Sequence, residues 1–278
     1  MSVEVLNKTN VTSDISIVVP IRNLERWRIK NLLSSIRQNS PTETILSDYG
    51  SNQESLKHLM ELSVEYDATL LHVETDGLWS RGLANNIGIR RSIGSNIIVI
   101  DGDVIMEPNV IEDSFRLLKD GCFVIRQPVF LDGQFNYNSL SLPEDYDKLR
   151  LEKEVYMGPS LGAFLAAPKS KWFELRGYDE RMRGWGSGDW EIRWRLMVSV
   201  RNEVIIGKAD APDKRYGVVP PQSGCNVYHQ WHVEPSERLG LSKELFDYHK
   251  KANQLLWGGD LSIIRNDEHW GLMRDEYH

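Results

Sequence analysis

The sequence predicts an α/β fold with a mostly parallel, Rossmann-like central sheet flanked by helices, and a smaller subdomain beside it. Short β-branched runs alternate with amphipathic segments through the first half of the chain, which is typical of βαβ crossovers. The apolar runs are continuous, as expected for strands buried on both faces. A chain of 278 residues, 41% of them hydrophobic, is long enough for one large domain of this kind.

The first half divides into strands and helices in regular order. The strand ISIVVP is uninterrupted and apolar, and the helix after it places Leu32, Leu33 and Ile36 on one face. Strands are predicted at residues 15–20, 44–46, 69–73 and 96–100, and helices at 24–37, 55–65 and 83–92.

In the second half of the chain the periodic spacing of apolar residues is weaker. Residues 131–153 mix Asp, Asn, Ser and Pro, so we expect an excursion or mobile loop there. A strand of small residues is predicted at 160–166 and a helix from Asp189 to about residue 199. Residues 207–224, with three prolines, are expected to form a loop.

Charge and composition argue against several classes of protein. A formal charge of -7 argues against a general nucleic-acid binder, and an acidic protein needs a metal or local Arg and Lys to hold an anionic ligand. No run approaches the roughly 20 apolar residues of a membrane span, and the first residues lack a secretion signal, so a cytoplasmic protein is expected. Two cysteines give no disulfide framework.

Polar residues follow three of the predicted strands. Pro20 to Asn23, Ser47 to Ser51 and Asp101 to Asp103 each stand where a strand ends. Ligands of open α/β sheets bind beyond the carboxyl ends of the strands. We therefore expect one shared cleft.

Asp101-Gly102-Asp103 is a candidate metal site. Two neighbouring carboxylates are unfavourable without a cation, and hard oxygen ligands suit Mg²⁺ or Mn²⁺ carrying a diphosphate. His229 or His232 could complete a site that favours Mn²⁺. The alternatives are a surface turn for the Asp-Gly pair and structural roles for the histidines.

Asp189 is a candidate general base. It follows two glycines at the start of a predicted helix, where the dipole favours an ionised carboxylate, although helix capping explains the same position. Glu191 could orient an acceptor. Arg81, with Asn85 and Asn86, could meet phosphate or ribose, and a solvated helix face is the alternative.

Tryptophans gather around the predicted base. Trp185, Trp190 and Trp231 offer aromatic faces that could stack on sugar rings. Trp194 is expected in the core instead.

These motifs resemble the inverting GT-A glycosyltransferases of family 2 over residues 15–232. The second half resembles family-7 galactosyltransferases and bacterial chondroitin polymerases. The family's Val-Pro-x-Arg-Asn stretch matches residues 19–23, and its helix start matches residues 79–88. By this resemblance Asp48 contacts the nucleotide base and Arg81 the nucleotide.

The family's Asp-x-Asp metal motif and its Gly-Trp-Gly-Gly-Glu-Asp acceptor motif match residues 101–103 and 184–189. The resemblance makes Asp189 the base and His229 a metal ligand, with His232 in reserve. This chain departs at Gly188, where the family has Glu, and at Trp190, where it has an acidic residue. These departures put the choice of acceptor in doubt.

The resemblance implies a metal-dependent hexosyltransferase, with Mn²⁺ or Mg²⁺, that moves a sugar from a UDP- or GDP-linked donor to a hydroxyl of an acceptor, expected to be a saccharide. Inversion is expected, and retention stays open. The implied nucleotide-binding residues are Pro20, Arg22, Asp48, Arg81, Asn85 and Gly102, and the implied acceptor or sugar residues are Trp185, Gly186, Ser187, Gly188, Trp190 and Glu191.

A single GT-A domain is expected over residues 1–278. Its parts are a nucleotide-sugar half at about 12–130, an acceptor half at about 155–235, and a C-terminal helix and tail at about 236–278. The tail, with Trp257 and Trp270, is expected to pack over the site or to form a homo-oligomer contact.

Two other classes of protein are alternatives to a glycosyltransferase. A sugar nucleotidyltransferase also carries paired aspartates, but the loop Ile21-Arg22-Asn23-Leu24-Glu25 lacks the glycines that triphosphate binding needs. A noncatalytic sugar-binding protein with Ca²⁺ on the carboxylates is the other alternative.

Overall fold

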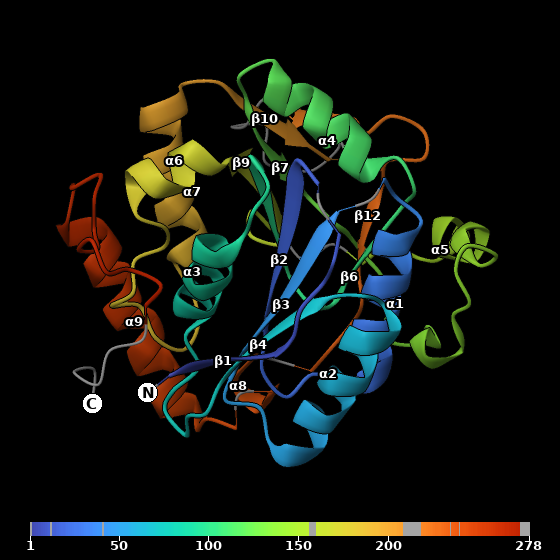
Figure 1. Ribbon diagram of the computed structural model, residues 1–278, viewed down its shortest axis with the longest axis horizontal. Coiled ribbons are helices and arrows are strands. Elements are labelled where there is room, and N and C mark those ends of the chain that lie inside the picture. Colours follow the sequence, from blue (N-terminus) through green and yellow to red (C-terminus); the bar gives the residue numbers. More distant parts are fainter. Residues whose placement is uncertain are drawn as a thin grey trace.

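The computed structural model describes residues 2–11, 13–40, 42–155, 160–207, 218–233, 235–238 and 240–272. Within them a nine-stranded sheet has the order β1-β4-β3-β2-β5-β9-β7-β10-β11 (Figure 1). Its strands are β1 (Val3–Asn7), β2 (Ile15–Ile21), β3 (Glu43–Tyr49), β4 (Thr69–Val73), β5 (Asn96–Ile100), β7 (Phe123–Arg126), β9 (Phe164–Pro168), β10 (Glu203–Ile206) and β11 (Val218–Val219).

Most strands of this sheet are parallel. β2, β3, β4 and β5 pair in parallel, and so do β7, β10 and β11. β9 runs antiparallel to both β5 and β7, and β1 runs antiparallel to β4. The predicted α/β fold with a mostly parallel central sheet is therefore confirmed.

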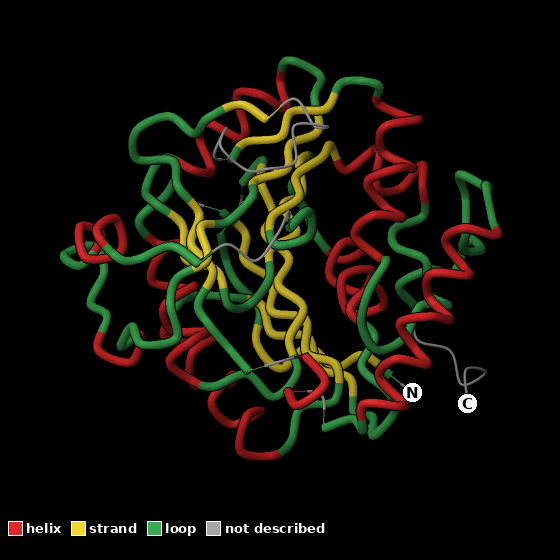
Figure 2. Tube along the Cα trace, turned by 180° about the vertical axis from the view of Figure 1, so that it is seen from behind, coloured by secondary structure: helices red, strands yellow, loops and turns green. Residues whose placement is uncertain are grey.

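Helices cover both faces of the sheet (Figures 1 and 2). Alternate residues of β2 explain why, because Ile17 and Val19 pack into one core and Val18 into the other. The first core includes residues of α1 (Arg26–Arg37), α2 (Gln53–Glu65) and α4 (Val110–Lys119). The second includes residues of α3 (Arg81–Arg91), α6 (Lys169–Leu175) and α7 (Gly188–Val200).

A second sheet and a small helical segment lie beside α1. The sheet has the order β6 (Val104–Met106), β12 (Val227–His229) and β8 (Val129–Phe130). The helical segment contains the 3-10 helix η1 (Tyr137–Ser139) and α5 (Tyr146–Leu151). Leu131, Tyr137, Tyr146 and Leu149 form a separate core with Ile105 and Tyr228.

The expected excursion over residues 131–153 is largely irregular, but it includes the short helices η1 and α5. Its helices are too short for a period to be visible in the sequence, and its apolar side chains are buried by partners elsewhere in the chain.

The C-terminal part contains α8 (Pro235–Arg238) and the long helix α9 (Lys243–Gly259), which lies on the side of α3 and α7 (Figure 1). Trp270 follows it and is buried, with Phe173 against its ring and Arg90 Nη1 bound to its carbonyl. Most of the predicted loop at 207–224 lies outside the described residues, which resume at β11. Over the described part of the chain, each helix is too short or too polar to cross a bilayer.

Candidate active site

Asp101, Gly102 and Asp103 form the turn that connects β5 to β6. The backbone N of Asp101 donates to Ala163 O of the neighbouring β9 region at 3.1 Å, and its carbonyl accepts from Val104 N at 3.3 Å. Gly102 packs against Leu24. Because the chain changes sheets here, the two carboxylates reach different partners.

Arg81, the first residue of α3, joins Asp101 to the predicted base. Its guanidinium donates to Asp101 Oδ1 at 2.8 Å, to Asp189 Oδ1 at 2.5 Å and to Gly162 O at 2.7 Å. Asp101 and Asp189 are therefore close together although 88 positions separate 101 from 189 in the chain. The arrangement places the first half of the chain against α7 of the second half.

The charges of this group depend on one another. Burial raises the pKa of Asp101 to about 6, Arg81 opposes this rise, and Asp103 and Asp189 add to it. Burial also disfavours the charge of Arg81, but Asp101 and Asp189 outweigh it and raise the pKa of the guanidinium well above its ordinary value. Arg81 therefore stays charged and holds two carboxylates near one point.

Asp103 faces the two histidines. His229 Nε2 lies 3.5 Å from Asp103 Oδ1, and His232 Nε2 lies 3.6 Å from Asp103 Oδ2. β12 pairs antiparallel with β6, which sets His229 opposite Val104 beside the aspartate. The three side chains offer ligand atoms within 4.8 Å of one another.

One carboxylate with two imidazoles fits a divalent transition metal such as Mn²⁺ or Zn²⁺. The sequence left the choice between His229 and His232 open, and the structure places both beside Asp103. Asp101 is not in this cluster, because Arg81 binds its carboxylate.

Asp189 is the second residue of α7, whose N-cap is Ser187 in a left-handed conformation. Its side chain remains 37% exposed, so a substrate can reach it. Gly162 makes this position possible, since a methyl group there would overlap the Asp189 carboxylate. Sequence patterns gave no reason to single out Gly162.

The predicted nucleotide-binding residues lie mainly at the ends of β2 and β3. Arg22 Nη1 donates to Gly77 O at 2.5 Å. Asp48 is buried and accepts hydrogen bonds from His72 Nδ1 at 2.7 Å and Ser51 Oγ at 2.5 Å. Because an ionised carboxylate only accepts, His72 Nδ1 carries the proton.

The two strand ends are also tied together. The backbone N of Asn23 donates to Ser51 Oγ at 2.9 Å, and Asn23 Oδ1 accepts from Asn52 N at 2.8 Å. Two of the remaining candidates are buried. Pro20 is inside β2, and Asn85 is fully buried on α3, so in this structure it offers no surface to a nucleotide.

The predicted acceptor residues divide between surface and interior. Trp185 is 45% exposed and Trp190 is half-buried, whereas Gly186, Ser187 and Gly188 form the turn before α7. Glu191 is fully buried and bound to Arg195, with Nη2 to Oε2 at 2.7 Å. The proposal that Glu191 orients an acceptor does not fit this position.

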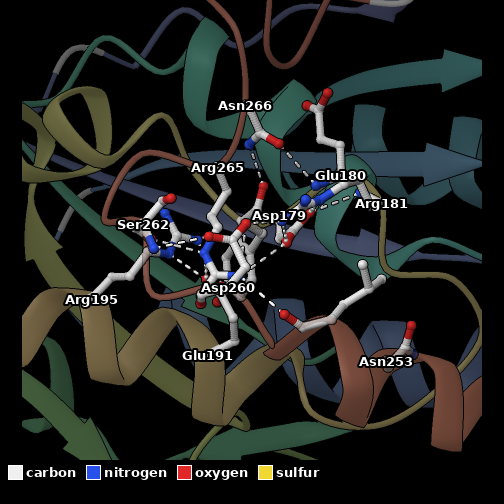
Figure 3. Close-up of polar contacts among 12 residues, drawn as sticks. Asp179, Glu180, Arg181, Glu191, Arg195, Asn253, Asp260, Ser262, Arg265 and Asn266 are labelled. Carbon is white, nitrogen blue, oxygen red and sulfur yellow. Dashed lines mark hydrogen bonds and ion pairs between the residues drawn. The ribbon is translucent and has the colours of Figure 1, made fainter. Parts of the chain in front are cut away.

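Glu191 belongs instead to a buried ion cluster between α7 and the segment after α9 (Figure 3). Arg265 is fully buried, and its guanidinium lies 3.4 Å from Glu191, 3.4 Å from Asp260 and 3.7 Å from Asp179. Arg181 joins Asp179 to Asp260, with both contacts at 2.7 Å. The cluster fastens the C-terminal segment to the helix that carries Asp189.

Asn253 on α9 supports the turn before that helix. Its Nδ2 donates to the carbonyls of Arg183 at 2.8 Å, Trp185 at 3.2 Å and Gly186 at 3.3 Å. The Trp185 ring also stacks on Phe246 of α9, with ring centroids 5.6 Å apart. The sequence carries no motif that would connect α9 with this turn.

The fold and this group of aspartates and histidines point to a class of protein, the GT-A glycosyltransferases. The chain belongs to glycosyl transferase family 2, whose family model matches residues 16–172. A sequence search of curated proteins gave no match. The family assignment confirms the predicted family 2 and a glycosyltransferase, and the likeness of the second half to family 7 stays a prediction.

Solved structures share this fold at low sequence identity. TarS 1–349 of S. aureus in complex with UDP-GlcNAc has a TM-score of 0.55 and 13% identity, over 90% of this chain and 68% of that chain. GalNAc-T7 with UDP, GalNAc and Mn²⁺ has a TM-score of 0.53 and 16% identity, over 80% and 44%. Another structure of TarS 1–349 has a TM-score of 0.52 and 13% identity, over 78% of this chain, and the match spans 60% of its length.

Proposed function

We propose that this chain is a metal-dependent glycosyltransferase that moves a sugar from a nucleotide diphosphate to an acceptor hydroxyl, with Asp189 as the general base. The observation that carries the proposal is the Arg81 guanidinium, which holds Asp189 next to the Asp101 turn. That turn leads directly to Asp103, which faces His229 and His232.

The donor that we favour is a UDP-linked sugar. This choice is supported by structures of the same fold that were solved with UDP, with UDP-GlcNAc and, in one case, with UDP, GalNAc and Mn²⁺. Arg22 and Asp48 stand at the ends of neighbouring strands, where ligands of α/β sheets bind. We assign the nucleotide to this edge.

We assign the metal to Asp103, His229 and His232. When bound there, Mn²⁺ would neutralise charge on the diphosphate leaving group. Mg²⁺ is the weaker candidate because imidazole ligands suit transition metals better.

Asp189 acts on the acceptor side. Its exposed carboxylate accepts the proton of the acceptor hydroxyl, and the oxygen attacks the anomeric carbon from the face opposite the diphosphate. A single displacement of this kind inverts the configuration. Arg81 donates to Asp189 Oδ1 and so orients the carboxylate that accepts the proton.

The acceptor that we propose is a saccharide. Trp185 and Trp231 are both large and about half exposed, at 45% and 46%. Aromatic rings at such positions offer apolar faces to sugar rings. The resemblance to family-7 enzymes rests on the same turn and on His229, and it remains part of this proposal.

The decisive variant is Asp189→Asn. It removes the base while keeping the shape of the side chain, so turnover with a UDP-sugar and a saccharide acceptor should fall about 10²- to 10⁴-fold. Donor binding, measured by calorimetry with Mn²⁺, should change little because the donor does not need the base.

Asp120→Asn is the charge-matched control, since Asp120 is exposed at the end of α4. Near-normal turnover of Asp189→Asn would exclude the base assignment. Equal donor affinity with and without Mn²⁺ would exclude metal dependence.

A further inference from the structure

The chain between His229 and His232 is attached to α1. β12 ends at His229, so the next residues lie outside the ladder. Gln230, which is fully buried, follows at once, and its backbone N donates to Asp103 O at 2.8 Å. One residue thus adjoins His229 in sequence and binds the main chain of Asp103.

The Gln230 side chain is bound twice by α1. Its Nε2 donates to Arg28 O at 3.2 Å, and its Oε1 accepts from Asn31 Nδ2 at 2.9 Å. Asn31 is itself buried and also donates to Tyr137 O at 3.0 Å. The amide of Gln230 therefore has a defined orientation.

Arg28 binds the main chain of the same stretch. Its guanidinium donates to Gln230 O at 3.2 Å and Trp231 O at 2.8 Å, while Glu25 accepts from its Nε at 2.8 Å. The Arg28 side chain is only 4% exposed. A buried guanidinium is unfavourable unless its donors are satisfied, and here two backbone carbonyls satisfy them.

These contacts come from an element that contributes no ligand. α1 belongs to the first half of the chain, as Asp103 does, whereas the histidines belong to the second half. The distance between Asp103 and the histidines therefore depends on how firmly residues 230–231 are held against α1.

We propose that Arg28, Asn31 and Gln230 are positioning residues of the metal centre, which fix His229 and His232 opposite Asp103 and so set the affinity for the metal. The proposal rests on the metal site assigned above. Partners that orient metal ligands without binding the ion typically change the affinity by about 10- to 100-fold.

The test is the dissociation constant for Mn²⁺ alone, measured by titration calorimetry and by electron paramagnetic resonance on the full chain. Arg28→Lys and Asn31→Ala should each weaken Mn²⁺ binding by about 10-fold or more. Lysine keeps the charge but lacks the planar fork that reaches two carbonyls. His229→Ala shows how much Mn²⁺ affinity is lost when a direct ligand is removed.

Two controls on α1 separate positioning from stability. Arg26→Lys changes an exposed arginine that pairs with Glu61, and its Mn²⁺ affinity should be that of the unaltered protein. Ile36→Val loosens the core contact of the same helix. Thermal unfolding with a chelator shows whether each variant is folded and how much stability it has lost.

The outcomes distinguish two failures. Tight Mn²⁺ binding that requires His229 but is unchanged in Arg28→Lys and Asn31→Ala would overturn the positioning proposal and leave the metal site intact. An equal loss of affinity in Ile36→Val would overturn it too, since general loosening would then suffice. Absence of Mn²⁺ binding, or binding indifferent to His229→Ala, would refute the metal site itself.

Discussion

Arg81 is the side chain on which the candidate site depends most directly. The neighbouring carboxylates of Asp101 and Asp189 repel each other, and burial already raises the pKa of Asp101 to about 6. The Arg81 guanidinium lies between them and reduces this repulsion by binding both carboxylates. Replacing it with a neutral residue would raise the pKa of Asp101 further, because the positive charge that opposes the rise would be lost.

Gly162 sets the position of Asp189, so Gly162→Ala is expected to displace the carboxylate. A methyl group would occupy the same space as the carboxylate, and misplacement of a catalytic group by about 1 Å can cost about 10²-fold in rate. Turnover should fall by about that factor. Gly258→Ala on α9, where a methyl group meets open space, is the matched control. Normal turnover of Gly162→Ala would mean that Asp189 tolerates the shift.

The buried pair of His72 and Asp48 makes stability depend on pH. The hydrogen bond to Asp48 raises the pKa of His72 above 6.5. The stabilisation from the charged pair is therefore complete below about pH 6.5 and is lost as the pH rises through the folded-state pKa.

Urea unfolding of the unaltered protein and of His72→Gln between about pH 5.5 and 9 tests this dependence. The difference in unfolding free energy should be largest at the acid end and shrink towards the alkaline end. The exposed His269→Gln is the control. A difference that grows with pH would contradict the assignment.

At the scale of helices and strands, the sequence was most informative where apolar runs are long. The strands at 69–73 and 96–100 match β4 and β5, because buried parallel strands are continuous and apolar. β6, β8 and β12 have two or three residues each, too few for a period. The antiparallel direction of β9 could not be predicted either, since side-chain alternation is the same in both directions.

The candidate site could likewise be predicted only in part from the sequence. Asp101, Asp103 and Asp189 stand in recognisable local patterns, so the sequence could name them. Other residues of the site could not be named in this way: Gly162 meets Asp189, His72 binds Asp48 and Asn253 binds the turn before α7 only in the folded chain. Contacts between residues far apart in the chain produce no recognisable pattern in the local sequence.

Helix α9 is expected to control the turn before α7 through Asn253. Asn253→Ala would leave the carbonyls of Trp185 and Gly186 without this donor, which should lower the free energy of unfolding by about 1–3 kcal/mol. The acceptor KM should rise more than the donor KM, because we propose that the acceptor binds at this turn. Gln254→Ala, at an exposed neighbour, is the control. Equal changes in both KM values would argue against a local effect.

For the molecule as a whole, the candidate site lies where the two halves of the chain meet. Arg81 reaches Asp189, and a β-bridge joins Ser80 to Gly184. β9 of the second half lies between β5 and β7 in one continuous sheet. Loosening either half should therefore disturb the site.

The buried ion cluster connects the C-terminal segment to α7, so its contribution to stability can be measured by removing Arg265. Arg265→Met would leave Asp179 and Glu191 buried with less compensation, and breaking a buried ion pair typically costs about 3–5 kcal/mol. Chemical unfolding should show a loss of that size. Arg116→Met, at an arginine whose side chain is 55% exposed, should cost much less because solvent screens its ion pairs. Equal losses would mean that the cluster contributes little.

The same cluster has a consequence for biosynthesis. Arg265 is translated long after Asp189, yet it lies against Glu191 on the helix that bears the proposed base. A nascent chain that stalls before Asp260 would keep the pairs of Asp179 with Arg181 and of Glu191 with Arg195 but would lack Arg265, the cation that lies against both carboxylates. Ribosome-bound chains should then lack transferase activity until residues 260–265 have emerged from the exit tunnel.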